Sequence, residues 1–170
     1  MARGFFRRHR IVIVVALLAL VADQASKLVV IQSLPLGGSW PDEGFFRFTH
    51  VANSGSAFGL FGDRNLILSF ASIIGIGVLL LFYRSYETQG FLVQLSLGLM
   101  LAGAIGNLAD RIALGHVTDF IDVGPWYIFN VADSAVVVGV IMLATTVVLD
   151  RERASGMPAH AITLQDPNDK

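Results

Sequence analysis

Long apolar segments dominate the hydropathy pattern of this 170-residue chain. A helix needs about 20 mostly apolar residues to cross a bilayer, and four stretches approach that length. They are residues 11–31, 66–83, 91–109 and 131–149. The pattern predicts an all-α membrane protein with four transmembrane helices. An even number of crossings places both termini on the same side of the membrane.

The first apolar stretch follows a basic N-terminus, a combination that is also typical of a secretory signal peptide. No suitable small-residue cleavage site precedes the polar group that begins at Asp23, and three further spans follow. We therefore interpret the stretch as an uncleaved signal anchor. A signal peptide that is removed is the alternative.

Basic residues next to the spans predict the orientation of the chain. Lys and Arg accumulate in cytoplasmic segments that flank transmembrane helices. The residues concerned are Arg3, Arg7, Arg8 and Arg10 before the first span, Arg84 between the second and third, and Arg151 and Arg153 after the fourth. The N and C termini are thus expected to be cytoplasmic. Residues 32–65 and about 110–130 are then expected to face outward.

The first outer segment, residues 32–65, is long for a simple connection. Apolar and polar residues alternate within positions 45–51, which is typical of a short strand or two lying at the membrane interface. An aromatic belt among the lipid headgroups is the alternative. Residues 154–170 are polar and are expected to form a disordered cytoplasmic tail. Residues 1–153 would then form a single integral membrane domain.

Composition narrows the possible classes of protein. Hydrophobic residues make up 54% of the chain and charged residues 15%, whereas globular chains have about 25% charged residues. A disordered chain, a coiled coil and a highly charged nucleic-acid binder are poor interpretations. The chain has no cysteine, which excludes disulfides, thiol nucleophiles and cysteine-based metal sites. We expect no cofactor, no metal ion and no nucleic-acid partner.

Several polar residues lie where the pattern predicts lipid, and such residues are costly unless they have a function. Asp23 and Lys27 are four apart on the first helix, so they share a face and can form an ion pair. They either belong to a site, or merely neutralise one another or extend outward to the interface. Asn107, Asp110 and Arg111 fall within about one turn at the end of the third span. Arg111 is placed to hold Asp110, or an incoming acidic or carbonyl group.

Asp119 and Asp133 are expected to meet at the outer boundary of the membrane. The third span ends there and the fourth begins there, and a reversal near Pro125 and Trp126 would bring the two carboxylates across from each other. Asp122 competes with Asp119 for this position. A helix cap formed by Asp133 or an ordinary solvated loop are the structural alternatives.

A carboxylate pair of this kind has a chemical consequence. Like charges a few ångströms apart in a poorly hydrated place share one proton, because the pKa of one of them rises. An acid and a base then coexist near neutral pH. Aspartic proteases use this arrangement to activate water against a peptide carbonyl.

Five blocks of sequence, taken in order, resemble the bacterial lipoprotein signal peptidases, also called signal peptidase II. The blocks are residues 23–27 (DQASK), 53–59 (NSGSAFG), 106–111 (GNLADR), 117–120 (VTDF) and 129–134 (FNVADS). The resemblance covers about residues 11–150. It implies a four-helix membrane aspartyl endopeptidase with a small outward-facing β-rich cradle in the first outer loop. Such an enzyme removes the signal peptide from diacylglyceryl-modified prolipoproteins and cuts just before the lipid-modified cysteine.

The resemblance also implies roles for individual residues. Asp119 and Asp133 match the catalytic pair. The residues that match the lining of the site, which positions the substrate backbone, are Asn53, Asn107, Arg111 and Asn130. Asp23 and Lys27 match a supporting pair. Asp110 and Ser134 match positions that give structural support. Ser56 and Ala109 stand where bulkier or more apolar residues often occur. A monomer in the bacterial cytoplasmic (inner) membrane is implied, in contact with membrane lipid and with its active site at the outer leaflet.

Three other functions are compatible with parts of the sequence. A serine hydrolase would use Ser54, Ser56 or Ser134 with His50 or His116, but no Gly-x-Ser-x-Gly elbow is present. A zinc enzyme would need a run such as His-Glu-x-x-His, which is also missing. A small carrier, channel or assembly factor would use Asp23, Lys27 and Arg111 as pathway charges.

Overall fold

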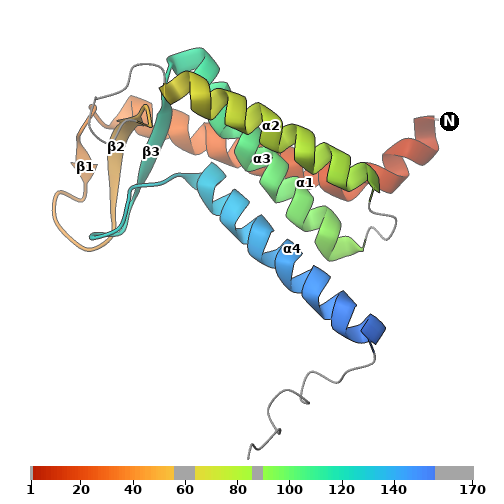
Figure 1. Ribbon diagram of the computed structural model, residues 1–170. Helices are drawn as coiled ribbons and strands as arrows, with labels where there is room; N and C mark the ends of the chain where they lie inside the picture. The colour runs from red at the N-terminus through yellow and green to blue at the C-terminus, as the bar shows by residue number, and fades with distance from the viewer. Residues whose placement is uncertain (1, 56–63, 86–89, 156–170) are drawn as a thin grey trace, which may run out of the picture.

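Four long helices and a small sheet make up the computed structural model, which describes residues 2–55, 64–85 and 90–155. The helices are α1 (Ala2–Ser33), α2 (Arg64–Ser85), α3 (Phe91–Leu114) and α4 (Val131–Ser155). Each contains a segment long and apolar enough to cross a membrane: His9–Ser33, Asn65–Ser85, Phe91–Leu114 and Val131–Arg153. The sheet lies at one end of the helices (Figure 1). The predicted fold class is therefore confirmed.

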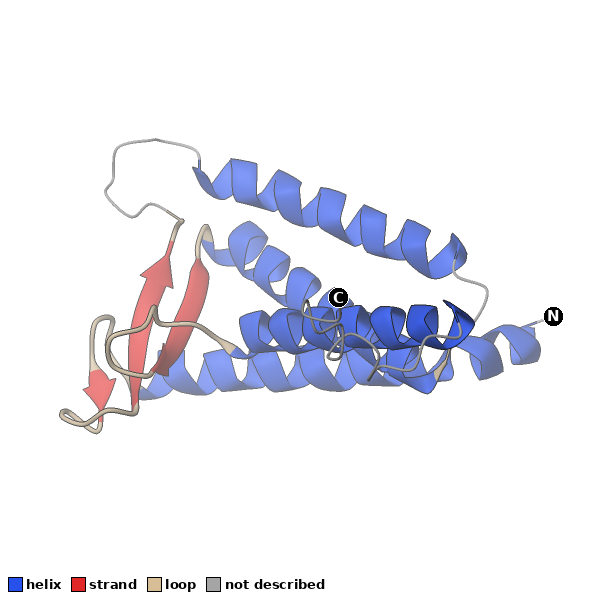
Figure 2. Cartoon of the chain, turned by 60° about the horizontal axis from the view of Figure 1, so that its bottom comes forward, coloured by secondary structure: helices blue, strands red, loops and turns tan. Residues whose placement is uncertain are grey.

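Helix α3 is the centre of the bundle. It packs against α1, α2 and α4, and α1 also contacts α4. Within the described residues, the backbone of α2 comes close only to that of α3, and Tyr83 of α2 also contacts the ring of His9 on α1. Figure 2 shows α2 at the edge of the bundle. Half of the apolar window of α3 is buried inside the protein, and none of that of α2 is. Most of the surface of α2 is therefore available to lipid.

The close packing of α3 against α4 depends on glycine. A Cβ atom built on Gly103 would collide with the carbonyl oxygen of Ala132 and would lie 2.6 Å from Cγ2 of Val136. A Cβ on Gly139 would lie 2.6 Å from Cγ of Met100. Small residues let transmembrane helices approach closely, and packing then supplies much of the association energy.

Helix α3 continues past the predicted end at residue 109 and reaches Leu114. It stops at Gly115, whose φ of 77° is left-handed and whose N–H donates to the carbonyl oxygen of Arg111. Polar residues near position 110 do not end the helix, because other parts of the protein supply partners for their charges and hydrogen bonds. Asp110, for example, is 4% exposed and paired with Lys27 of α1. The outer connection is thus shorter than expected.

The sheet joins the two outer connections. Its strands β1 (Ser39–Trp40), β2 (Arg47–Asn53) and β3 (Val117–Asp122) are antiparallel and lie in that order. The alternating stretch at 45–51 predicted β2, which is confirmed with a shift of two residues. Strand β3 was not predicted, and it brings the second outer connection into the cradle. The tail was expected to begin at residue 154, but α4 continues to Ser155. The rest of the tail, from residue 156, and the loop at 56–63, with Ser56, lie outside the described residues.

Replacing Gly103 with Ala should destabilise the protein, because the new methyl group has no space between α3 and α4. Overpacking of this kind costs about 1–3 kcal/mol, so thermal unfolding in detergent should occur several degrees lower. Gly75→Ala is the matched control, since a Cβ there meets nothing within 4 Å. Equal unfolding temperatures for both variants would contradict the proposed close packing.

Candidate active site

Asp119 of β3 and Asp133 of α4 line the same cavity. The cavity has a volume of about 680 Å³ and lies beside the first turns of α4. The chain reverses between the two residues: Ile121 pairs with Phe129, and Gly124 has a left-handed φ of 73°. The centre of this reversal falls at position 125, where the sequence placed it. The two carboxylates therefore face a common space.

Asp119 is almost completely buried, with 2% of its surface exposed. Its Oδ2 accepts a hydrogen bond from Nδ2 of Asn53 at 2.7 Å, and its Oδ1 accepts one from Nδ2 of Asn130 at 2.6 Å. Burial raises the pKa of Asp119 to about 6, and the nearby charge of Asp133 acts in the same direction, whereas the amide hydrogen bonds oppose it. Asp119 thus retains a proton at higher pH than an ordinary aspartate.

Asp133 takes part in the cap of α4 while it faces the cavity. Asn130 is the N-cap: its Oδ1 accepts the backbone N–H of Asp133 at 2.9 Å, and its own N–H donates to Oδ2 of Asp133 at 3.3 Å. This reciprocal pattern is a capping box. The other oxygen of Asp133, Oδ1, accepts Nδ2 of Asn107 at 2.7 Å. Helix capping and membership of the carboxylate pair, which the sequence left as alternatives, occur together.

Asp23, Lys27 and Asp110 form a buried ionic cluster between α1 and α3. Nζ of Lys27 lies 2.8 Å from Asp23 and 2.9 Å from Asp110, and all three side chains are almost inaccessible. The predicted pair of Asp23 and Lys27 is present. The partner of Asp110 is Lys27 rather than Arg111, the neighbour that the sequence suggested.

The other two predicted residues lie at the edges of this arrangement. Arg111 makes long hydrogen bonds of 3.4 Å to Oγ of Ser72 and to the carbonyl oxygen of Asn107. Its positive charge acts on Asp133 and Asp119. Ser134 lines the cavity and donates its hydroxyl to the carbonyl oxygen of Asn130 at 3.0 Å. The structure thus brings together all ten residues that the sequence singled out.

Asp122 does not belong to this site. It is 2% exposed and accepts hydrogen bonds from Arg47 at 2.7 Å and Thr49 at 2.9 Å, so it is neither solvated nor facing the cavity. The hydrogen bond from Thr49, followed by that from the backbone of Gly124 and the charge of Arg47, holds the pKa of Asp122 below its usual value against the effect of burial. Asp122 fastens β2 to β3 and is structural.

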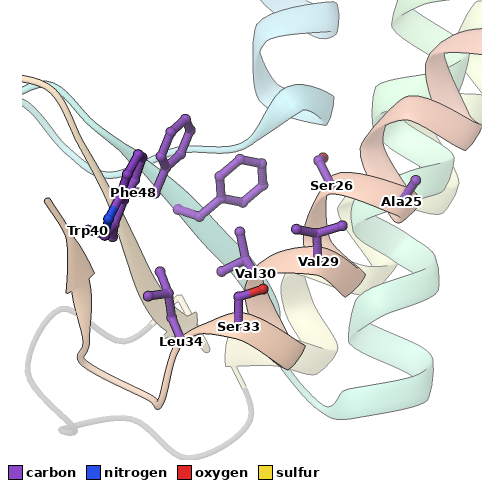
Figure 3. A pocket seen from close by; sticks show the side chains of 9 residues that line it. Ala25, Ser26, Val29, Val30, Ser33, Leu34, Trp40 and Phe48 are labelled. Atoms are coloured by element: carbon purple, nitrogen blue, oxygen red, sulfur yellow. The ribbon is translucent and has the colours of Figure 1, made fainter.

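A second cavity, of about 580 Å³, lies on the other side of β3. Successive residues of a strand point to opposite faces, and Phe120 lines this cavity whereas Asp119 lines the first. Figure 3 shows side chains of α1, among them Val29 and Val30, and the rings of Trp40 and Phe48 around one space. Its lining is apolar apart from two serines.

Sequence reasoning assigned no role to several residues that contribute to the site. Gln24 donates hydrogen bonds of 3.1 Å to both Asp23 and Asp110. Trp126 and Tyr127 line the cavity next to the aspartates. Gln24 was detectable as the polar neighbour of Asp23 at membrane depth. The two aromatic residues gave no signal, because only the reversal of the chain brings them over the cavity.

The alternative chemistries find no support in the described part of the chain. Among those residues, no group of His, Asp or Glu is arranged to hold a metal ion. The ring of His50 bonds the carbonyl oxygen of Leu34, and the hydroxyl of Ser134 bonds the backbone of its own helix. Neither is placed as a base or a nucleophile for serine hydrolysis.

Comparison with known families decides the identity of the chain. Residues 15–149 match the family described as signal peptidase (SPase) II. This chain belongs to that family. Signal peptidase II enzymes are membrane aspartic peptidases that remove signal peptides from prolipoproteins. With its four spans, this signal peptidase II is a multi-pass protein of the bacterial inner membrane.

Individual relatives agree with this assignment. The lipoprotein signal peptidase of Dehalococcoides mccartyi is 42% identical over 128 residues, which cover 73% of this chain and 80% of the relative. That of Geobacter sulfurreducens is 38% identical over 153 residues, or 85% and 96% of the two chains. A bacterial membrane enzyme solved at 2.3 Å superposes with a TM-score of 0.75 at 28% identity, over 84% of this chain and 90% of that one.

Proposed function

We propose that Asp119 and Asp133 are the two aspartates with which this signal peptidase II cleaves its substrate, and that the substrate is a diacylglyceryl-modified prolipoprotein cut just before the lipid-modified cysteine. The single observation that carries the proposal is the shared cavity, which both carboxylates line. Asn53, Asn107 and Asn130 hold the carboxylates in place through their side-chain amides.

Asp119 is proposed to carry the proton of the pair and Asp133 to act as the base. The raised pKa of Asp119, at about 6, favours its protonated form. Asp133 lies in the first turn of α4, where the helix dipole favours a negative charge. In the first step Asp133 takes a proton from water, the water oxygen bonds to the carbonyl carbon, and Asp119 gives its proton to the carbonyl oxygen.

The second step returns both protons. The tetrahedral intermediate collapses and its C–N bond breaks. The proton held by Asp133 goes to the leaving amine, and the hydroxyl proton returns to Asp119. The peptide products are a carboxylic acid and the free amine of the modified cysteine. Arg111, whose charge acts on both aspartates, is suited to bind a carbonyl oxygen of the substrate backbone.

The chemistry of the cavity supports a lipid-modified substrate. Its polar side chains, namely Asn53, Asp119, Asp133 and Ser134, gather beside the sheet. The lining then continues along α4 over Val137 and Val138, which lie in the membrane-spanning segment. Acyl chains fit the apolar part, and the scissile amide fits the polar part. All groups that hold the carboxylates come from one chain, so a monomer in contact with lipid suffices.

The first test compares substrate processing by variants of the two proposed catalytic aspartates with processing by a variant of an aspartate outside the cavity. Asp119→Asn and Asp133→Asn should each abolish processing of a lipid-modified prolipoprotein, because the pair loses its acid or its base; a loss of at least about 1,000-fold is expected for members of a catalytic unit. Asp150→Asn on α4 is the matched control. Asp150 lies outside the cavity, on the helix that carries Asp133, and this variant should process normally, which a gel shift to the mature size will show.

Full processing by either dyad variant would remove that residue from the proposed mechanism. The wild-type enzyme should also remain active in chelator and with serine-directed reagents. Loss of activity in chelator would favour a metal enzyme instead.

The second test uses pH. Removing the hydrogen bond of Asn53, which lowers the pKa of Asp119, should raise that pKa further. Since activity requires protonated Asp119, the alkaline limb of the profile of kcat/KM, which reports the free enzyme, should move to higher pH in Asn53→Ala. Ser39→Ala, which alters a hydroxyl contact elsewhere in the sheet, should leave the limb in place. A shift to lower pH would contradict the assignment of the proton.

The third test concerns orientation. We propose that both termini are cytoplasmic and that the sheet and dyad face outward. The C-terminal ends of α2 and α4 lie away from the sheet (Figure 1), and these ends carry Arg84, Arg151 and Arg153. The chain has no cysteine, so a single introduced cysteine is the one thiol that the reagent can label. An impermeant thiol reagent applied to spheroplasts should label Asp42→Cys, between β1 and β2, but not Asp150→Cys. The reverse pattern would invert the proposed topology.

A further inference from the structure

Lys27 is buried in the middle of the site but touches neither aspartate of the dyad. Its side chain is 3% exposed. An ammonium group has three N–H donors and no acceptor. All three donors have a partner here: Oδ2 of Asp23 at 2.8 Å, Oδ2 of Asp110 at 2.9 Å and Oδ1 of Asn107 at 3.1 Å. A buried lysine is costly unless it is paired in this way.

The contact with Asn107 has a consequence for the dyad. A side-chain amide has one end that accepts and one end that donates. Oδ1 of Asn107 accepts from Nζ of Lys27 and from Nδ2 of Asn130, each at 3.1 Å. Its Nδ2 therefore points the other way and donates to Oδ1 of Asp133 at 2.7 Å. A flipped amide would place N–H against an ammonium and oxygen against a carboxylate, and both contacts are repulsive.

The two carboxylates that neutralise Lys27 also hold the backbone beside the dyad. Oδ2 of Asp110 accepts the N–H of Thr118 at 3.1 Å, one residue before Asp119. Oδ1 of Asp23 accepts the N–H of Ala132 at 2.8 Å, one residue before Asp133. Lys27 thus links the two carboxylates that hold β3 and α4, the strand and the helix that carry Asp119 and Asp133.

We infer that Lys27 is a positioning residue for peptide hydrolysis: it fixes the orientation of the Asn107 amide and, through it, the carboxylate of Asp133. The inference rests on the proposed function of the Asp119–Asp133 pair and adds to it. Lys27 does not touch the substrate in this arrangement. Its removal therefore affects the chemical step rather than substrate binding.

The test begins with Lys27→Met, which keeps the length of the side chain but removes its donors. A small misplacement of a catalytic group costs up to about 100-fold in rate, so kcat should fall about 10- to 100-fold while KM stays unchanged. Because Lys27→Met leaves Asp23 facing Asp110 without a cation, a second variant is needed. Lys27→Met/Asp110→Asn leaves the net charge of the cluster unchanged and retains an oxygen for the N–H of Thr118.

A matched control separates positioning from packing. Gly98 lies on α3 more than two turns before Asn107, and a Cβ there would lie 2.9 Å from Cβ of Val15 on α1. Gly98→Ala should loosen the packing of α1 against α3 and lower the unfolding temperature but leave kcat unchanged. If it lowers kcat as much as the double variant does, general loosening between the two helices explains the effect and the inference is wrong.

Coupling to Asn107 gives the decisive measurement. If Lys27 acts through the amide, its substitution should add little further loss of kcat in an Asn107→Ala background. Full, multiplicative losses would overturn the inference, as would unchanged kcat in the folded double variant. Failure of the proposed function is distinguishable, because in that case Asp119→Asn and Asp133→Asn would retain processing.

Discussion

A polar group at bilayer depth must find its partner inside the protein, since lipid offers none. This constraint organises the outer half of the bundle. The charge of Lys27 is met by Asp23 and Asp110, and each of those carboxylates also accepts a backbone N–H from one of the segments that carry Asp119 and Asp133. The ionic cluster and the reactive pair therefore form one hydrogen-bonded structure.

Asparagine is the connecting residue in this network because its amide both donates and accepts. Asn107 accepts from Lys27 and donates to Asp133. Asn130 accepts the backbone N–H of Asp133 and donates to Asp119. A carboxylate in either position would add a third negative charge beside the dyad, and an apolar residue would leave buried donors and acceptors without partners. The amides thus hold the two carboxyl groups in one site without adding a charge of their own.

The sequence predicted the parts of this arrangement that follow from periodicity and topology. Four spans are visible as apolar runs, and the reversal near residue 125 requires only that two spans meet at the same boundary. Strand β3 was not predictable, since Val117–Asp122 becomes a strand only by pairing with β2, far away in the sequence. The length of α3 was underestimated for a related reason. Asp110 looks like a helix end until Lys27 of another helix is seen to neutralise it.

The capping box at the start of α4 links the proposed catalytic pair to the completion of the fold. Asp133 holds its position only when Asn130 begins the helix, and Asn130 reaches Asp119 only when β3 has paired. During biosynthesis the last crossing is inserted after the other three. A chain that lacks α4 lacks Asp133, so the proposed catalytic pair is complete only once this last helix is in place.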